Sequence, residues 1–281
     1  MQKILFSKKQ SDGEILNLSG KTHAMGRIHL FEFEDQQWFP NFLRDYGTDF
    51  LQFLSNKTKL YKPAIPILEK GLKASNTNQI VDLASGGGGG LLWLNQELLK
   101  THPDLKIVLT DYYPNLSAFE HTKKQAPNFE FINTSIDARK VPESLKGFRT
   151  QFLSLHHFRP DDAVQILQNA VDSNTGIGIF EAQERSFPSI LAMLFSPISV
   201  LLTTPFIRPF KIGRLIFTYL IPLVPLFVLW DGVVSSLRTY SVTEMEDLVS
   251  KVKNNETYHW EIGREKSGPG VMLYLLGTKK K

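Results

Sequence analysis

Three carboxylates and a run of five glycines are the residues of this chain whose types and spacing could do chemistry. Asp82 stands just before the glycines at 86–90, Asp111 follows about 20 residues beyond them, and Asp137 comes later. A glycine run lets main chain approach a nucleotide-like ligand, because a Cβ would block the approach or forbid the dihedral angles. Asp111 is placed to accept hydrogen bonds from ribose hydroxyls, and Asp137 to face an adenine amino group. A glycine turn alone is a weak signal, and the added acids favour a nucleotide-type site.

These residues need strands that end at one edge of a sheet. Apolar residues predict buried strands at 80–83, 106–110 and 129–133, and leucines predict a helix at 91–100. The three acids then lie at the carboxyl ends of successive strands, where open α/β sheets bind ligands.

The sequence here resembles the class I S-adenosylmethionine-dependent methyltransferases. Their first motif is an acidic residue followed by glycines at alternate positions. It is similar to Asp82-Leu83-Ala84-Ser85-Gly86-Gly87-Gly88, in which Ala84 replaces the first glycine and leaves slightly less room beside the cofactor. Leu155-His156-His157-Phe158 resembles the family's fourth-strand motif, which lies beneath the transferring methyl group. The similarity is close over residues 77–184 and loose at the carboxyl terminus.

The resemblance implies S-adenosylmethionine as the cofactor, with Asp111 as the ribose-binding acid and Asp137 on the adenine side. It implies an α/β fold: a Rossmann-like, doubly wound, mostly parallel seven-stranded sheet with an antiparallel C-terminal hairpin. A dehydrogenase fingerprint is not met, because its third glycine or alanine would stand where Leu91 is. The cofactor-binding residues predicted in this way are Asp82, Ala84, Ser85, Gly86, Gly87, Gly88, Asp111, Tyr112, Ile136, Asp137, Ala138 and Leu155.

His156, His157 and Glu181 are the candidate catalytic residues. An acceptor such as a hydroxyl would need a base, and the pKa of histidine suits that role. Glu181 lies at the end of a predicted fifth strand, and one histidine is expected to be a packed core residue. Neighbours on a strand point to opposite faces, so we expect no metal to be held by the pair.

Residues 1–78 are predicted to form an N-terminal helical cap, with a helix at 41–54. Packing of this helix on the core is one interpretation. The other is a lid that turns Glu32, Glu34, Asp35 or His29 toward a substrate. Residues 79–281 would then form the cofactor-binding domain.

Residues 188–230 form an apolar insertion with no acidic residue, and its charges are Arg208, Lys211 and Arg214. Prolines keep each apolar run below the roughly 20 residues that a spanning helix needs. We predict two short helices in a membrane interface, with the basic turn meeting anionic headgroups. The alternative is that they cap the site or form a dimer contact. Because the insertion borders the acceptor side, we predict a lipophilic or membrane-dissolved substrate.

Polar residues return after the insertion. Asp231 and Arg238 are interpreted as a structural ion pair in preference to substrate contacts, with Asp231 kept as a substrate-side candidate. Ser241 is a predicted helix N-cap with Glu244 at the capping-box position. Strands at 258–264 and 270–277 form the predicted hairpin.

The amino-acid composition limits the chemistry and the partners that this chain can have. The chain has no cysteine, which excludes disulfides and thiol chemistry, and its net charge of +4 is too small to argue for a nucleic-acid partner. Residues 1–12 lack the apolar core of a signal peptide. We therefore predict a cytoplasmic protein, peripheral on the inner face of a membrane.

Two functions fit the sequence. The first is methyl transfer from S-adenosylmethionine to a lipophilic small molecule or lipid at a membrane surface. The second is a non-catalytic, Rossmann-like binding or scaffold protein at the membrane, since fold alone does not decide function. The presence of acids at all three strand ends favours the enzyme.

Overall fold

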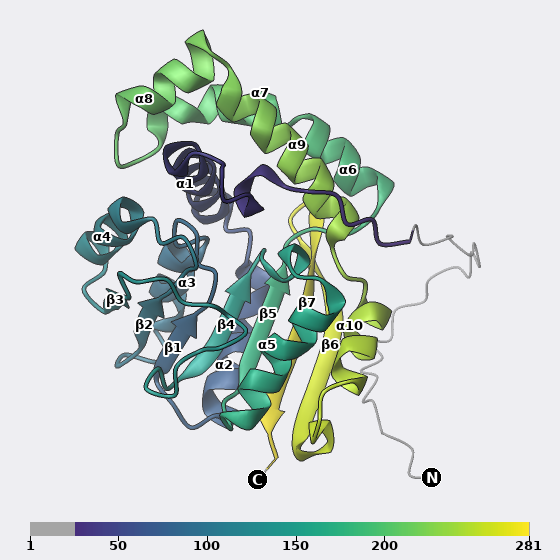
Figure 1. The fold of residues 1–281 in the computed structure, drawn as a ribbon. Helices are drawn as coiled ribbons and strands as arrows, with labels where there is room; N and C mark the ends of the chain where they lie inside the picture. The colour runs from purple at the N-terminus through teal and green to yellow at the C-terminus, as the bar shows by residue number, and fades with distance from the viewer. Residues whose placement is uncertain (1–25, 281) are drawn as a thin grey trace.

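The computed structural model describes residues 26–280 (Figure 1). In this part of the chain, seven strands form one sheet in the order β3-β2-β1-β4-β5-β7-β6. Strands β1 to β5 are parallel to one another, and β7 is antiparallel to both β5 and β6. The bounds are β1 Gln79–Asp82, β2 Lys106–Leu109, β3 Phe129–Phe131, β4 Phe148–Phe152, β5 Ile177–Glu181, β6 Tyr258–Ser267 and β7 Gly270–Lys279. The predicted Rossmann-like sheet and its antiparallel hairpin are confirmed.

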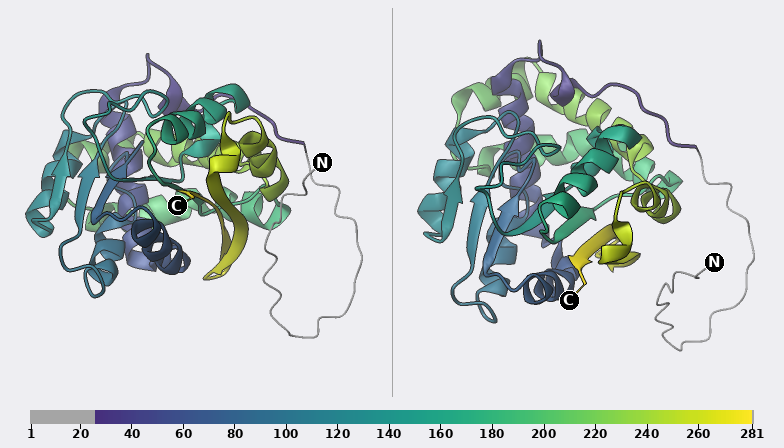
Figure 2. Two further views of the ribbon diagram at one scale, coloured as in Figure 1. Left: turned by 90° about the horizontal axis from the view of Figure 1, so that it is seen from below. Right: turned by 60° about the horizontal axis from the view of Figure 1, so that its bottom comes forward.

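Helices cover both faces of this sheet (Figure 1, Figure 2). One face carries α2 Ile65–Ala74, α3 Leu91–Leu98 and α4 Leu116–Gln125, and the other carries α5 Pro160–Asp172 and α10 Val242–Ser250. The first set packs on strand aromatics such as Phe148 and Phe180, and the second on aliphatic residues such as Ile179 and Leu273. Alternate residues of β5 thus serve the two cores, as expected for a strand buried on both faces.

We next compare the predicted start of α10 and the predicted ends of the hairpin strands with the structure. The predicted capping box opens α10: Glu244 N donates to Ser241 Oγ (3.2 Å), and Ser241 N donates to Glu244 Oε2 (2.8 Å). The hairpin strands β6 and β7 extend closer to their turn than predicted. Their ladder continues to the pair Ser267 and Gly270, so the connection is shorter than the expected residues 265–269.

The described part of the predicted cap contains the short turns η1 (Phe33–Asp35) and η2 (Lys62–Ala64) and the helix α1 (Asn41–Thr58). Helix α1 is one turn longer than the predicted helix at 41–54. Helix α2, predicted with the cap, packs on the sheet core. Residues 1–25, which include the stretch compared with a signal peptide, lie outside the described residues.

The insertion is larger than the two short helices predicted for residues 188–230. It forms an arch over the ends to which β4 and β5 point, with α1 between the arch and the sheet (Figure 1). Its inner side packs on α1 in a third apolar core that includes Phe50, Val200 and Phe227. Its elements are α6 Phe187–Leu194, α7 Ser196–Thr203, η4 Thr204–Phe206, α8 Ile212–Leu215, the π-turn η5 Ile216–Leu220 and α9 Leu223–Arg238.

A buried ion pair also holds the arch on α1. Arg214 Nη1 lies 2.5 Å from Asp49 Oδ2, and Lys211 Nζ lies 2.9 Å from the same oxygen. Arg214 also donates to the carbonyls of Ile207 and Pro209. The prediction that these basic residues face lipid headgroups is therefore wrong for Arg214 and Lys211, because a buried carboxylate turns both inward.

Within residues 26–280, no single helix is long and apolar enough to cross a membrane. Two pairs of helices reach the required length and apolar composition when each pair is taken as one bent segment. These pairs are Phe187–Leu194 with Ser196–Phe206, bent by 41°, and Ile212–Leu220 with Leu223–Arg238, bent by 79°.

Removing the charge of Asp49 should weaken the contact between α1 and the arch and so destabilise the protein. Asp49→Asn leaves the buried Arg214 without its carboxylate, which should lower the free energy of unfolding by about 3–5 kcal/mol in urea titrations. The double variant Asp49→Leu with Arg214→Met should lose clearly less, because both buried charges are gone. Arg208→Met, at an exposed arginine of the same insertion, is the control and should change stability by less than about 0.5 kcal/mol. A double variant as unstable as Asp49→Asn would contradict this account.

Candidate active site

A cavity of about 690 Å³ opens at the carboxyl ends of the parallel strands. Three parts of the chain line it: the loops that follow the parallel strands β1 to β5, the N-terminal segment with α1, and the inner side of the arch. The strand order reverses between β1 and β4, so the cavity lies at the switch point of the sheet. Open α/β sheets bind ligands at that place.

The glycine loop after β1 forms one wall of the cavity. Its backbone is left-handed at Gly86 (φ 54°), Gly88 (φ 94°) and Gly89 (φ 47°), and also at Ala84 (φ 53°), where the resembled motif has glycine. Glycine adopts such angles at little cost, whereas an alanine there is strained.

The glycines also make room for the cap, which the sequence did not reveal. A Cβ on Gly87 would lie 2.8 Å from the carbonyl oxygen of Thr48 in α1. One on Gly90 would lie 2.7 Å from the ring of Tyr61. The bare loop is therefore the surface on which α1 rests, in addition to a surface that a ligand can approach.

Two of the three predicted acids line the cavity. The carboxylate of Asp111 accepts hydrogen bonds from Gly86 N and Tyr113 N, both at 2.7 Å, and burial raises its pKa. Asp137 also lines the cavity, and its bidentate contact with Arg139 lowers its pKa. Asp111 therefore ties the glycine loop to the end of β2.

Asp82 lies behind the loop and does not line the cavity. Its side chain accepts a hydrogen bond from Thr150 Oγ1 (2.6 Å), and its carbonyl accepts from Ser85 Oγ and Thr110 Oγ1. Burial raises the pKa of Asp82 to about 7. The side chain thus links β1 to β4, the carbonyl holds the start of the loop, and we expect no direct contact of Asp82 with a cofactor.

The other predicted cofactor residues divide in the same way. Those that line the cavity are Ala84, Ser85, Gly86, Gly87, Tyr112, Ile136 and Ala138. Gly88 and Leu155 are not among the lining residues of the described chain, and Leu155 is fully buried in the core.

The two histidines lie on a 3-10 turn, η3 (Leu155–His157), and not on a strand. Strand β4 ends at Phe152, and Leu153 then takes a left-handed φ of 51°. The imidazole rings consequently point the same way, with centroids 4.3 Å apart and planes tilted by 33°. The expectation that they face opposite sides is wrong, because it assumed extended backbone.

Glu181 is a positioning residue for this turn. Its Oε1 accepts from Ser154 N (3.1 Å) and Leu155 N (2.7 Å), and its Oε2 lies 2.7 Å from His156 Nδ1. The side chain is fully buried and is not among the residues that line the cavity. The contact fixes the ring of His156, so that its Nε2 is directed toward Glu32, 4.0 Å from Oε2.

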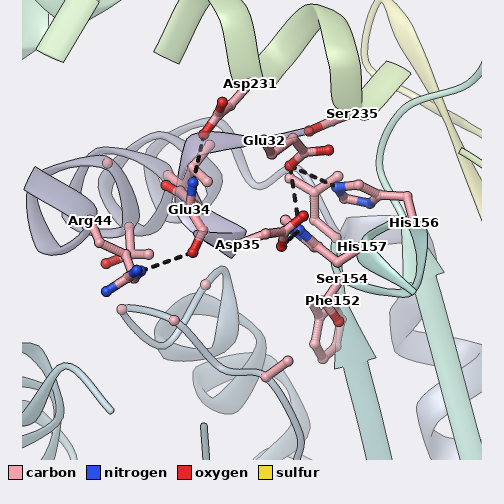
Figure 3. A pocket seen from close by; sticks show the side chains of 18 of the residues that line it. Glu32, Glu34, Asp35, Arg44, Phe152, Ser154, His156, His157, Asp231 and Ser235 are labelled. Carbon is pink, nitrogen blue, oxygen red and sulfur yellow. Dashed lines mark hydrogen bonds and ion pairs between the residues drawn. The ribbon is translucent and has the colours of Figure 1, made fainter. Parts of the chain in front are cut away.

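His157 faces the acids of the N-terminal segment (Figure 3). Its Nδ1 lies 2.8 Å from Asp35 Oδ1 and 3.3 Å from Glu32 Oε2. Burial alone would lower the pKa of His157, but these two carboxylates outweigh it and raise the pKa to about 10. The pKa of Asp35 is lowered, because His157 and Arg238 outweigh its burial. His157 is therefore protonated at neutral pH and does not fit the predicted role of a base.

Asp231 and Arg238 do not pair with each other, contrary to the prediction. Asp231 accepts from Phe33 N (2.8 Å) and from Glu34 N (3.1 Å). Burial raises the pKa of both Asp231 and Glu34, which line the cavity. Asp231 thus caps the η1 turn and fixes the N-terminal segment on α9.

Arg238, interpreted from the sequence as the partner of Asp231, pairs instead with acids of the N-terminal segment. Its Nη1 lies 2.7 Å from Asp35 Oδ2 and 2.9 Å from Glu32 Oε1, and its Nη2 donates to the carbonyl of His157. His29, a predicted lid residue, also lies on the cavity, and burial with Arg238 and Arg27 lowers its pKa to about 4. An arginine just after a long apolar run was the signal available in the sequence. We call Glu32, Asp35, His156, His157 and Arg238 the histidine–carboxylate cluster.

Comparisons with known proteins were made for the whole chain. No protein-family model and no curated protein sequence matches it. An O-methyltransferase family protein from Burkholderia thailandensis matches in structure at 16% identity, over 82% of this chain and 59% of its own, with a TM-score of 0.46. Human N-acetylserotonin methyltransferase in complex with S-adenosylmethionine matches at 17% identity, over 83% and 56%, with a TM-score of 0.45. A Rhodobacter sphaeroides protein provisionally described as a Zn-dependent alcohol dehydrogenase matches at 12% identity, over 85% and 98%, with a TM-score of 0.49.

The chain therefore spans less than two thirds of the length of the first two structures. At these identities and TM-scores the likenesses carry no argument about activity, which has to come from the site itself.

Glycine at position 84 should stabilise the loop. Ala84→Gly removes a strained left-handed alanine and should raise the free energy of unfolding by about 0.5–1 kcal/mol, after the larger backbone entropy of the unfolded state is counted. Ala74→Gly, at the end of α2, is the control and should lower it, since glycine is a poor helix former. Urea titration compares the two variants, and a loss of stability in both would show that Ala84 is not strained.

Proposed function

We propose that this protein transfers a methyl group from S-adenosylmethionine to a lipophilic small molecule or lipid that it takes from a membrane surface. One observation carries the proposal. A single cavity has the glycine loop and Asp111 on one side and the inner face of an apolar arch on the other.

The residues of the cavity fit the cofactor. The loop presents main chain without side chains, and a Cβ on Gly89 would meet no atom within 4 Å. Ser154 Oγ and Gln183 Nε2, on residues that line the cavity, are buried and have no hydrogen-bond partner in the described chain. Asp111 would hold the ribose, and Asp137 with Ala138 would lie beside the adenine. Bound there, the cofactor supplies a methyl group that its sulfonium has already activated.

The residues of this chain then have to align the acceptor with the methyl group and exclude water from the cavity. The arch covers the cavity with Met193 of α6 and with Phe227 and Val228 of α9. On the opposite wall, Phe152 stacks on Phe180 with ring centroids 4.9 Å apart. An apolar acceptor would be held between these side chains, while the histidine–carboxylate cluster supplies the polar end of the cavity.

The outer face of the arch supports the lipid part of the proposal. Phe187, Leu202, Ile212 and Leu220 are between 68% and 77% exposed. Such a large apolar surface is unusual on a soluble protein and marks a contact with a partner or a membrane. We favour a lipid bilayer, because residues 188–230 carry no acidic residue and because Arg208 is left exposed beside this surface. Residues of the same arch then face the bilayer outside and the cavity inside.

Calorimetric titration tests the cofactor. The protein should bind S-adenosylmethionine, and Asp111→Ala should weaken binding by about 1–3 kcal/mol, roughly 5- to 150-fold, through the loss of a buried hydrogen-bond partner. Asp104→Ala, at an exposed acid, is the control and should leave the affinity unchanged. Absence of binding by the unaltered protein would reject the enzyme in favour of the non-catalytic scaffold.

Vesicle sedimentation tests the membrane contact. The triple variant Leu202→Gln, Ile212→Gln and Leu220→Gln should bind phosphatidylcholine vesicles at least about tenfold more weakly, since each buried aliphatic side chain contributes about 1.5–3 kcal/mol. Leu116→Gln, at an exposed leucine of α4, is the control. Undiminished sedimentation of the triple variant would contradict a role for the arch. The variant should still bind S-adenosylmethionine, since none of its changes lines the cavity.

A further inference from the structure

We propose that Glu32, His156 and His157 form a binding site for a divalent transition-metal ion in the wall of the cavity. This goes beyond methyl transfer, and it revises the expectation from the sequence that no metal is bound.

The ligand atoms converge from two distant parts of the chain (Figure 3). Glu32 Oε2 lies 3.3 Å from His157 Nδ1 and 4.0 Å from His156 Nε2, and the three ligand atoms lie within 4.8 Å of one another. Bonds of about 2.0–2.1 Å in a tetrahedral zinc site place neighbouring ligands about 3.3 Å apart. Small side-chain movements would therefore close the three atoms around an ion, which would displace the proton of His157 Nδ1 and its contact with Asp35.

Glu181 orients one of these ligands, His156, in the way that metal sites require. A metal-binding histidine usually has its other ring nitrogen held by a carboxylate or a carbonyl, which fixes the ring and its tautomer. Glu181 Oε2 holds His156 Nδ1 at 2.7 Å and leaves Nε2 as the ligand atom. Glu181 itself is fixed by Ser154 N and Leu155 N, so the arrangement is rigid.

Glu32 is a buried carboxylate that Arg238 contacts without a well-aligned hydrogen bond. Its side chain is 1% exposed, and its Oε1 receives no hydrogen bond from the described residues, although Arg238 Nη1 lies 2.9 Å away. Asp35 adds a second carboxylate next to His157. A buried carboxylate is costly unless it is paired or binds a metal, and a dication on Oε2 would add a second positive partner to the one that Arg238 provides at Oε1.

The ligand types limit the ion. Two imidazole nitrogens and a carboxylate suit Zn²⁺, Co²⁺ or Mn²⁺ better than Mg²⁺ or Ca²⁺, which prefer shells of oxygen. All three ligand residues line the cavity, so the ion would keep a position open toward it. A hydroxyl or carbonyl oxygen of the methyl acceptor would complete the shell, a part of the inference that rests on the proposed function.

Cobalt titration of the full chain, after treatment with EDTA, tests the site. The protein should develop visible absorption bands that saturate at one Co²⁺ per chain, and Zn²⁺ should displace them. His157→Ala and Glu32→Gln should each weaken binding by at least about tenfold, since even residues that only orient ligands have effects of that size. His259→Ala, at an exposed histidine of β6, is the control and should bind as the unaltered protein does.

Absence of the bands in the unaltered protein, or bands that persist in both His157→Ala and Glu32→Gln, would overturn the proposal. Calorimetry with S-adenosylmethionine on the same variants shows whether the cavity is intact, so that lost cobalt binding with retained cofactor binding supports the site. Cobalt binding by a protein that fails to bind S-adenosylmethionine would reject the proposed function and leave the metal site standing. Should a variant not fold, a Zn²⁺-dependent rise in the melting temperature of the unaltered protein supports the site, and no rise counts against it.

Discussion

The bare main chain of the glycine run at residues 86–90 is the constraint on which the rest of the structure depends. Helix α1 rests on one side of this loop, where a Cβ on Gly87 would strike the carbonyl of Thr48. The cavity opens at the same loop, and Asp111 fixes the distance between the loop and the end of β2. Side chains in this stretch would push the cap away and fill the cavity together. The position of the cap and the space in the candidate cofactor site therefore depend on the same glycines.

Charged residues deep in the molecule join the cap to the arch. Asp49 of α1 draws Arg214 and Lys211 inward, and Arg238 at the end of α9 contacts Glu32 and Asp35. Buried charges are expensive unless they are paired, so these contacts favour one placement of an otherwise apolar arch. The arch can then expose apolar side chains on its outer face and still keep a fixed position over the cavity.

Much of the fold follows from local sequence patterns. Strand and helix periods, the glycine run and the Ser241–Glu244 capping box are short-range signals, and the structure follows them. The placement of Asp111 and Asp137 on a common cavity follows from the rule that parallel strands end at one edge. Asp82 shows the limit of that rule, because its position at a strand end did not reveal that its side chain points behind the loop.

The histidine–carboxylate cluster could not be predicted in this way. The left-handed turn at Leu153 brings the rings of His156 and His157 to one side, and nothing in the neighbouring residues signals it. The contact between Glu32 and Arg238 joins residues that are far apart in the chain, so it depends on tertiary packing. The inward turn of Arg214 depends in the same way on Asp49, a residue of another helix.

A crystal structure with S-adenosylhomocysteine would test the central claim most directly. The account predicts that the ligand lies in the cavity, with its ribose hydroxyls at Asp111, its adenine beside Asp137 and Ala138, and its sulfur directed toward the arch. A ligand bound elsewhere, or a cavity that stays without it at saturating concentration, would contradict the account.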